Sequence, residues 1–343
     1  MKAAFTTTDG VRVGEVPEPI PGKGQVLVAP LSAGICGSDL HMVDALAGLG
    51  DAAPRIVMGH EFCAEILEAG PGTSGRFAPG TRVVSVPHIL GPSGPVDLGL
   101  SPESPGGFAQ RSVMQESLLL RVPDDLADDH AALTEPFAVA VHAVRAARPE
   151  PGDVALVVGC GPIGLAVIAA LKADGHGPVV AADFSPARRA LAERLGADIV
   201  LDPAESSPYE RWAELEVVEQ PPSPLLEEGI LAGNVVAFEC VGAPGLIQQI
   251  IDGVPRHSRI VVVGVGIAPD TITPVSAILK EVSLAFVFAY RQQEFAHALE
   301  MLASGRVDAQ AFVTGSVGLD GVADAFADLR TPDEHVKVIV RPR

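Results

Sequence analysis

The sequence is poor in cysteine and in basic residues. Its four cysteines lie far apart and form no Cys-x-x-Cys pair, which argues against a disulfide framework and favours a reducing, cytoplasmic location. Lysine occurs at five positions only, and 43 acidic residues against 24 basic ones give a formal net charge of -19. Nucleic acids and anionic membrane surfaces require clustered Lys and Arg, so neither is expected as a partner.

Long uncharged runs are also scarce, and the longest one does not predict a membrane span. Residues 154–171 carry no charge over 18 positions, which is the lower edge of the spanning range. The run contains three glycines and a proline, and it divides into a strand, a turn and a helix. We interpret it as the buried start of a nucleotide-binding domain.

The length of 343 residues and a hydrophobic content of 48% predict about two domains, each with a sizeable core. Residues 1 to about 134 show short strand patterns, such as 25–30, 62–68 and 81–86, separated by Gly and Pro clusters. This punctuation is typical of a β-rich, barrel-like unit. The stretch 91–107, rich in Gly, Pro and Ser, is expected to be an exposed loop.

From residue 135 onward, strand and helix patterns alternate, which predicts a parallel, doubly wound sheet. The expected strands are 154–158, 179–182, 198–201, 235–239 and 259–263, and the expected helices are 135–147, 163–173, 186–195 and 245–251. The acidic, proline-bearing segment 206–233 does not fit the alternation, and a surface helix is expected over 208–215. After residue 275 the pattern gives helix, strand, helix and a closing strand, 336–340.

A glycine motif marks the dinucleotide site. Gly159, Gly161 and Gly164 form G-x-G-x-x-G between a strand and a helix, with Pro162 and Ile163 inside the motif. The first glycine permits the tight turn, the second lets the backbone approach a pyrophosphate, and the third lets the helix pack on the strand. The helix N-terminus then offers free N–H groups to the phosphates.

The next strand ends in Asp183, which lies 19 residues after the third glycine of the motif. A carboxylate there can accept hydrogen bonds from the ribose hydroxyls and repels a 2′-phosphate, so NAD is favoured over NADP. Arg188 is expected to lie over the adenosine. It is also a possible phosphate ligand, which leaves NADP as the alternative.

A second cluster of reactive residue types begins at Cys36. Taken alone, Cys36 could be a small buried hydrophobe and His60 a core histidine. Together with a glutamate, Glu61 or Glu135, they match the three or so N, S or O ligands of a catalytic zinc ion. Ser38 and His41 would stand beside the ion as groups able to move a proton, and Asp39 suits the role of accepting the far N–H of His60.

These residues resemble those of the zinc-containing medium-chain alcohol and polyol dehydrogenases, the group that includes sorbitol, threonine and butanediol dehydrogenases. The matching elements occur in order and span most of the chain: 36–41, 59–61, 106–109, Glu135-Pro136 followed by His142, 159–164, 239–242 and 280–281. The resemblance implies an α/β protein with a GroES-like catalytic domain, residues 1–138 and 276–343, and an inserted Rossmann NAD-binding domain, residues 139–275.

The resemblance also implies the roles of individual residues. Zinc is expected on Cys36 and His60, with Glu61 as the third ligand and Glu135 bound directly or through the zinc water, and these two glutamates remain alternatives. Val241 and Val265 are implied as further cofactor contacts. Ser38 would take the proton of the alcohol, and the route would continue through the nicotinamide ribose to His41 and then to water.

Other expectations concern the substrate, metal count and assembly. The residues considered for the substrate pocket are mostly apolar and favour a secondary alcohol over a sugar polyol: Met42, Val43, Met58, His88, Ile89, Phe108, Phe286 and Phe288. Many relatives carry a second, structural zinc on four cysteines, but residues 87–107 contain none, so one zinc per chain is expected. The apolar run 282–288 is expected to pair across a two-fold axis in a homodimer or homotetramer.

Two other functions are compatible with parts of the sequence. A zinc-free quinone or enoyl reductase of the same superfamily would use NADPH, but it needs neither Cys36 nor His60, and Asp183 opposes NADPH. A nucleotide-binding protein without catalytic activity would retain the fold alone. The complete set of presumed ligands and proton-moving residues argues against both.

Overall fold

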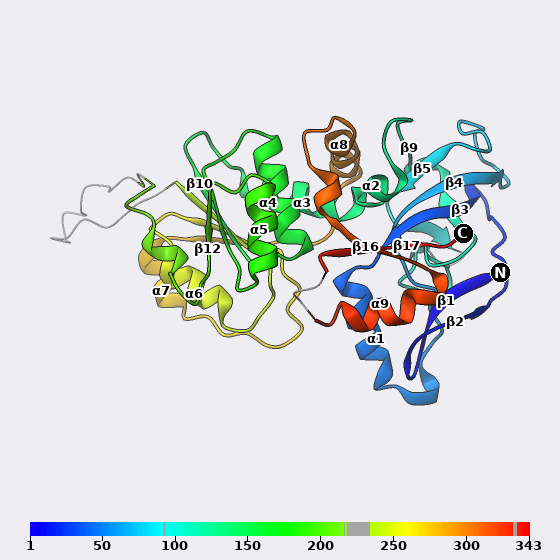
Figure 1. The fold of residues 1–343 in the computed structure, drawn as a ribbon, viewed down its shortest axis with the longest axis horizontal. Coiled ribbons are helices and arrows are strands. Elements are labelled where there is room, and N and C mark those ends of the chain that lie inside the picture. Colours follow the sequence, from blue (N-terminus) through cyan, green and yellow to red (C-terminus); the bar gives the residue numbers. More distant parts are fainter. Residues whose placement is uncertain (92–93, 216, 218–233, 332–334) are drawn as a thin grey trace. The chain divides into compact units, whose positions relative to one another are not determined.

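The computed structural model describes residues 1–91, 94–215, 217, 234–331 and 335–343 (Figure 1). The chain forms two compact units. The first comprises Met1–Glu135 and Phe295–Arg343, and the second comprises Pro136–Glu294. Helices α3 (Thr134–Ala147) and α8 (Gln292–Ala303) begin at the two places where the chain passes from one unit to the other.

The first unit is built on a seven-stranded mixed sheet. Its order is β16-β17-β3-β4-β5-β9, with β8 also paired to β3. The strands are β3 (Gln25–Gly34), β4 (Glu61–Ala69), β5 (Arg82–Ser85), β8 (Ser112–Gln115), β9 (Leu119–Arg121), β16 (Val313–Gly318) and β17 (Lys337–Arg341). Strand β17, from the end of the chain, pairs with β3 from its beginning, so both chain ends build this unit.

Within the described residues, two hairpins, three short helices and most of α8 complete the first unit. The hairpins are β1 (Lys2–Thr7) with β2 (Gly10–Glu15) and β6 (His88–Gly91) with β7 (Gly94–Asp97); the helices are α1 (Gly37–Ala47), α2 (Asp128–Ala132) and α9 (Val322–Asp328). The expectation of an exposed loop over 91–107 is wrong in part. Residues 94–97 form β7, and Leu98 and Ser104 are buried because the segment folds back onto the sheet.

The second unit contains a six-stranded, fully parallel sheet with the order β12-β11-β10-β13-β14-β15. The strands are β10 (Val154–Val158), β11 (Val179–Ala182), β12 (Ile199–Leu201), β13 (Val235–Glu239), β14 (Arg259–Val262) and β15 (Ser283–Phe286). Helices α4 (Pro162–Ala173) and α5 (Pro186–Arg194) cover one face, and α6 (Leu246–Gly253) and α7 (Pro274–Lys280) cover the other (Figure 1). The central strands are buried on both faces, which explains their continuous apolar sequence.

Two details of the second unit differ from expectation. Strand β15 pairs with β14, so residues 276–294 belong to this unit and the chain returns to the first unit at Phe295. Residues 208–210 form a short 3-10 turn in place of the surface helix expected over 208–215, because Trp212 is buried and its Nε1 donates to the Gly253 carbonyl. The remainder of the unplaced segment, residues 216 and 218–233, lies outside the described residues.

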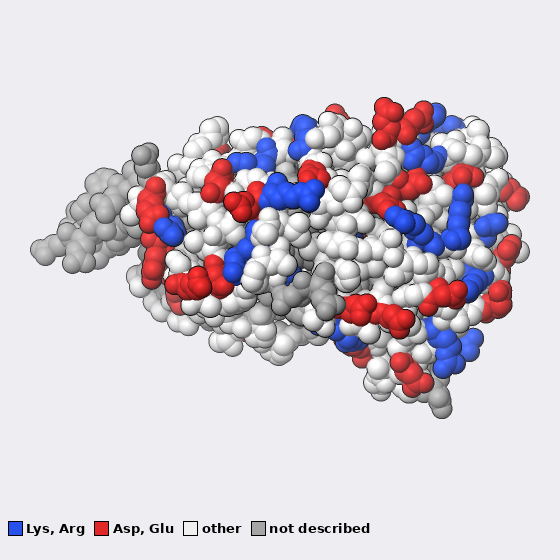
Figure 2. All heavy atoms as spheres, in the orientation of Figure 1, with Lys and Arg blue, Asp and Glu red and all other residues white. Residues whose placement is uncertain are grey.

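Acidic and basic side chains are interspersed over the face drawn in Figure 2. Within the described residues, no helix is both long enough and apolar enough to cross a membrane. All four cysteines are free thiols.

Candidate metal centre and dinucleotide site

A thiol, an imidazole and a carboxylate converge in the first unit. Strands β3 and β4 are antiparallel, and Gly34 near the end of β3 lies opposite Glu61 at the start of β4. Cys36 follows β3 at the N-cap of α1, and His60 directly precedes β4. The ligand atoms of Cys36, His60 and Glu61 all lie within 4.8 Å of one another. Strand pairing thus brings Cys36 to His60 and Glu61, which lie 24 and 25 positions later in the chain.

The surroundings of His60 suit a metal ligand. The Asp39 carboxylate is fully buried; its Oδ2 accepts the backbone N–H of Cys36 at 2.9 Å, and its Oδ1 faces His60 Nδ1 at 3.5 Å. Burial by itself lowers the pKa of His60, but Asp39 and Cys36 outweigh it and raise the pKa well above its usual value. A carboxylate at the far ring nitrogen fixes the orientation of a metal-binding imidazole. These donors therefore fit a zinc ion.

Lys337 is a member of this cluster that the sequence analysis did not identify. Its Nζ donates to both Glu61 oxygens, at 2.8 and 2.7 Å, and to the Ile35 carbonyl at 3.1 Å. Lys337 and Glu61 are both buried, and the carboxylate fits because Gly34 has no side chain: a Cβ there would lie 2.2 Å from Glu61 Oε2. Burial lowers the pKa of Lys337, but Glu61 and Cys36 outweigh that effect and raise it.

Glu135 is placed at the edge of this region. It lies in the first turn of α3, and its charge contributes to the raised pKa of Lys337. The three-residue cluster found among the described residues does not include it. Glu61 is thus the carboxylate that accompanies Cys36 and His60 in this structure.

Ser38 and His41 both lie on α1, one helical turn apart. Ser38 Oγ is 3.4 Å from His60 Nε2, and the residue is exposed. His41 is also exposed, and its charge contributes to lowering the pKa of Asp44. Residues three apart on a helix lie on the same face. A hydroxyl beside the cluster and an imidazole open to solvent therefore share one side of α1.

The glycine motif adopts the geometry that a pyrophosphate requires. Gly159 has φ +91°, and a Cβ at Gly164 would lie 1.8 Å from the Gly159 carbonyl oxygen. At Gly161 a Cβ would meet nothing within 4 Å, and this residue is the N-cap of α4 with no side-chain cap. Pro162 occupies the first helical turn and is followed by the half-buried Ile163. The N-terminus of α4 therefore keeps the free N–H groups that bind phosphate.

Asp183 supports this turn from the end of β11. Its Oδ2 accepts the backbone N–H of Cys160 at 2.7 Å, and its Oδ1 accepts that of Ser185 at 2.8 Å. Burial and the nearby Asp183 raise the pKa of Cys160 to about 12, so this thiol stays protonated. Arg188 is half-buried, and its Nε has no hydrogen-bond partner within the described part of the chain.

Val241 and Val265 follow β13 and β14 at the same edge of the sheet. Both are large apolar residues with at least half of their surface exposed, at 50% and 64%. The two turns pack closely, since a Cβ at Gly242 would lie 2.7 Å from the Val265 carbonyl. Two exposed valines beside the glycine turn provide an apolar surface for a flat ring.

The residues considered for the substrate pocket do not form one group. Met58 and Phe108 are fully buried in the core of the first unit, so their place there is structural, and Ile89 also belongs to that core. His88 pairs with Asp97 at 2.9 Å across the β6–β7 hairpin. Phe286 and Phe288 are exposed on the second unit. Their sequence pattern does not distinguish a pocket wall from a core.

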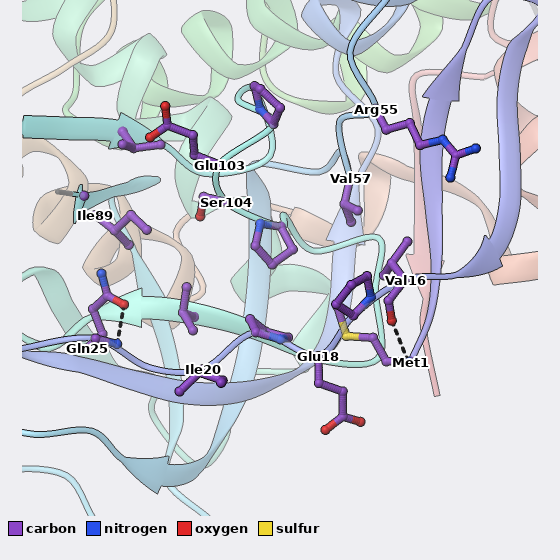
Figure 3. Close-up of a pocket in the computed structure, with 18 of the residues that line it drawn as sticks. Met1, Val16, Glu18, Ile20, Gln25, Arg55, Val57, Ile89, Glu103 and Ser104 are labelled. Atoms are coloured by element: carbon purple, nitrogen blue, oxygen red, sulfur yellow. Dashed lines mark hydrogen bonds between the residues drawn. The ribbon is translucent and has the colours of Figure 1, made fainter. Parts of the chain in front are cut away.

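The first unit also has a large cavity of about 860 Å³ that the metal cluster does not line (Figure 3). Ile89, Val57 and Ile20 contribute apolar walls, and Glu18, Glu103 and Arg55 contribute charged groups. Figure 3 shows these side chains around the segment that leads from β2 to β3. The cavity is therefore distinct from the cluster of Cys36, His60 and Glu61.

Comparisons with known proteins identify the family of the chain. Residues 22–124 match the alcohol dehydrogenase GroES-like domain, and residues 162–304 match the zinc-binding dehydrogenase domain. The chain is 34% identical to (R,R)-butanediol dehydrogenase of Bacillus subtilis, covering 100% of both chains, and 29% identical to sorbitol dehydrogenase of the same organism, covering 100% of this chain and 97% of the relative.

A solved structure shows the same arrangement. The crystal structure of 2R,3R-butanediol dehydrogenase from Bacillus subtilis superposes with a TM-score of 0.84 at 32% identity, covering 100% of this chain and 99% of the other. The expected α/β architecture, a GroES-like unit with a Rossmann sheet, is confirmed. The chain belongs to the zinc-binding medium-chain alcohol and polyol dehydrogenases, enzymes that use zinc and NAD(H).

Proposed function

We propose that the chain reversibly oxidises a secondary alcohol of moderate size to the ketone, with NAD as hydride acceptor. The observation that carries the proposal is the convergence of Cys36, His60 and Glu61 within 4.8 Å, with the Ser38 hydroxyl 3.4 Å from His60. An ion-binding cluster with a proton-accepting group beside it is the arrangement that alcohol oxidation requires.

Each residue of the cluster has a task in this proposal. Cys36 and His60 hold the zinc, and Asp39 keeps the His60 ring in place. Glu61 serves as third ligand, with Glu135 as the alternative that exchanges with it. When bound, zinc supplies Lewis-acid polarisation of the substrate oxygen, and the nicotinamide accepts the hydride.

Ser38 and His41 move the proton. Ser38 accepts the hydroxyl proton of the alcohol, because its Oγ lies 3.4 Å from His60 Nε2 and the residue is exposed. His41, which is exposed, is the last group of the relay and releases the proton to water. The shared face of α1 supports this order, because the serine lies at the cluster and the histidine lies one turn further along.

Asp183 carries the preference for NAD. Its carboxylate is anchored by two backbone N–H groups at the end of β11 and so stays at the ribose position. A fixed negative charge there repels a 2′-phosphate. We expect a kcat/KM for NAD at least about tenfold above that for NADP. Equal kcat/KM values for NAD and NADP would instead indicate that Arg188 binds the 2′-phosphate.

The substrate is tested on a panel that includes the compounds named by the relatives. Zinc-loaded protein is incubated with NAD and 2-butanol, 2,3-butanediol, sorbitol or threonine, and NADH formation is followed. We expect the highest kcat/KM with the first two compounds. Turnover by metal-free protein would contradict the zinc-dependent reaction, and turnover of sorbitol alone would contradict the preference for a low-polarity alcohol.

Two cysteine variants test the assignment of the metal ligands. Cys36→Ala is expected to lose both bound zinc and turnover, because the thiolate ligand is gone. Cys63→Ala is the matched control: Cys63 is a free, buried thiol beside Asp128, and burial keeps its pKa raised. Cys63→Ala should retain both bound zinc and turnover. We expect one zinc per chain by metal analysis, and two would contradict the absence of a structural site.

We further propose a homodimer or homotetramer formed through the edge of the Rossmann sheet. Within the described residues, strand β15 pairs with β14 and is the last strand of the sheet. Exposed apolar side chains surround it: Ile278, Leu279, Phe286 and Phe288. An apolar patch at a free strand edge favours pairing with another copy. Phe288→Asp should lower the mass measured by light scattering to that of a monomer, and a monomeric parent would contradict the interface.

A further inference from the structure

Ile20 is an exposed aliphatic side chain beside the large cavity of the first unit. It lies between β2 and β3, lines the cavity of about 860 Å³, and is 89% exposed. Leu90 also lines the cavity and is 60% exposed. Among the described residues of the first unit, the third exposed large apolar side chain is Leu49, which does not line the cavity. The exposed aliphatic groups of this unit are therefore concentrated at the cavity.

The segment that carries Ile20 is stiff. Three prolines, Pro17, Pro19 and Pro21, alternate with Glu18 and Ile20. Each proline fixes its own φ angle and restricts the residue before it. Little conformational freedom is therefore lost when another surface binds Ile20.

The cavity itself offers a matching apolar surface. Its walls include several aliphatic side chains: Val57, Ile89, Val96 and Val113. Its volume lies in the range of about 300–1,000 Å³ that is typical of sites that bury a bound molecule. One face of the first unit therefore has both an apolar projection, at Ile20, and an apolar recess beside it (Figure 3).

Charged groups of both signs surround the recess. Lys23, Arg55, Glu18 and Glu103 belong to the lining and are exposed, and none of the four forms an ion pair with another described residue. The remaining acidic residue of the lining, Glu15, is paired with the N-terminal amine at 3.1 Å. This face therefore has no net charge, although the chain as a whole has a formal net charge of -19.

We propose that this face binds the same face of a second copy of the chain across a two-fold axis. A two-fold interface requires one surface that is complementary to itself. Ile20 of each copy enters the recess of the other, and the acidic residues of each copy meet the basic residues of the other. Copies with a large net charge of one sign repel each other, and a contact face without net charge lowers that repulsion.

A second copy accounts for more of this face than a small ligand does. An apolar ligand in the recess would leave Ile20 exposed and the four charged groups without partners. The second copy covers Ile20 and provides a charge of opposite sign for each of the four groups. Projection, recess and charges thus find their partners in one contact.

The inference rests on the dimer proposed above at β15 and extends it to a homotetramer. A tetramer with closed symmetry makes the new contact twice between its two dimers. Two linked contacts hold more tightly than one, because the second forms within a complex that is already bound. A single contact between two monomers is too weak to persist, so Phe288→Asp is still expected to give monomers.

Sedimentation equilibrium of the zinc-loaded protein tests the proposal. The parent is expected to be a tetramer and Ile20→Asp a dimer of half its mass, because the variant places a charge in the apolar recess. Leu49→Asp is the matched control, since Leu49 is exposed in the same unit but does not line the cavity. It should keep the mass of the parent, and both variants should keep its Tm.

The other outcomes separate this contact from the one at β15. A dimeric parent that Phe288→Asp splits and Ile20→Asp leaves unchanged would overturn the new contact and retain the contact at β15. A tetramer that persists in Ile20→Asp would also overturn the new contact. A monomeric parent would overturn both contacts.

Exchange of charges distinguishes a second copy from any other partner. One double variant carries Glu18→Lys with Glu103→Lys, and another carries Lys23→Glu with Arg55→Glu. Each variant alone should stop at the dimer, because charges of like sign then meet across the axis. An equimolar mixture should restore the tetramer mass, since every contact now joins opposite charges. A mixture that stays at the dimer mass would overturn the two-fold contact.

Discussion

The candidate metal centre and the dinucleotide turn are built in different ways. In the first unit, the site consists of side chains from residues 36, 60 and 61, joined by a lysine from the last strand. In the second unit, the turn consists of backbone within a single stretch of six residues. The first depends on charge and on strand pairing, and the second depends on the absence of side chains. Substitutions in the two sites should therefore affect different properties of the protein.

Ser38→Ala gives the largest expected effect on the first site. Loss of a general base should lower kcat by about 10²–10⁴ while zinc content and NAD binding stay unchanged. The measurement is steady-state kinetics with metal analysis on the same preparation. Ser38→Thr keeps the hydroxyl and should restore part of the rate. Turnover of Ser38→Ala equal to that of the parent would remove Ser38 from the reaction.

Lys337→Met tests whether the metal centre depends on a buried ion pair, and the quantity measured is the stability of the protein. The variant leaves Glu61 buried without its cation, which is expected to cost about 3–5 kcal/mol in the free energy of unfolding of the metal-free protein. Urea denaturation measures it. Lys2→Met is the matched control, because Lys2 pairs with exposed Asp320 and should cost no more than about 1 kcal/mol. Similar losses in both variants would contradict the buried pair.

Two alanine substitutions separate packing from ligand space in the dinucleotide turn. Gly164→Ala places a Cβ against the Gly159 carbonyl and should destabilise the protein by about 1–3 kcal/mol. Gly161→Ala meets open space, so its Tm should match that of the parent while NAD affinity falls about tenfold or more. Scanning calorimetry measures the stability of the two variants, and titration calorimetry measures their affinity for NAD. Equal stability of the two variants would contradict the close approach at Gly164.

The smallest effect concerns a carboxylate of the first unit outside the metal cluster. Burial raises the pKa of Asp129, but Arg341 and Ser32 donate to it and outweigh burial, so the pKa is lowered. Such a group stabilises the fold above its unfolded pKa of about 3.9 and loses this effect as pH falls through the lowered value. Asp129→Asn should therefore cost about 1 kcal/mol at pH 7 and progressively less below about pH 4. A pH-independent difference between parent and variant would contradict the shift.

The contrast also explains what the sequence could predict. The glycine motif and Asp183 are close in sequence, and each has a local physical reason, so the turn, its helix and its supporting carboxylate were all predictable. Cys36 and His60 were identified by residue type. Lys337 was not, because it lies in an apolar strand, and only the pairing of β17 with β3 brings it to Glu61.

Other differences have the same origin. The β15 strand was predicted correctly as a strand, but its assignment to a unit depends on a partner strand that its own sequence does not specify. The apolar residues Met58 and Phe108 resemble pocket residues and core residues equally well, and only their burial distinguishes the two. In each case, the missing information is a contact between segments far apart in the chain.

The contact between Lys337 and Glu61 has a consequence for synthesis of the protein. The two residues are 276 positions apart, and the whole of residues 136–294 is made between them. At ribosomal rates, roughly 15–55 s pass between the appearance of the glutamate and that of its ammonium partner. A charged carboxylate is costly to bury without its partner, so we expect the nascent first unit to close its interior around Glu61 only after strand β17 has been made.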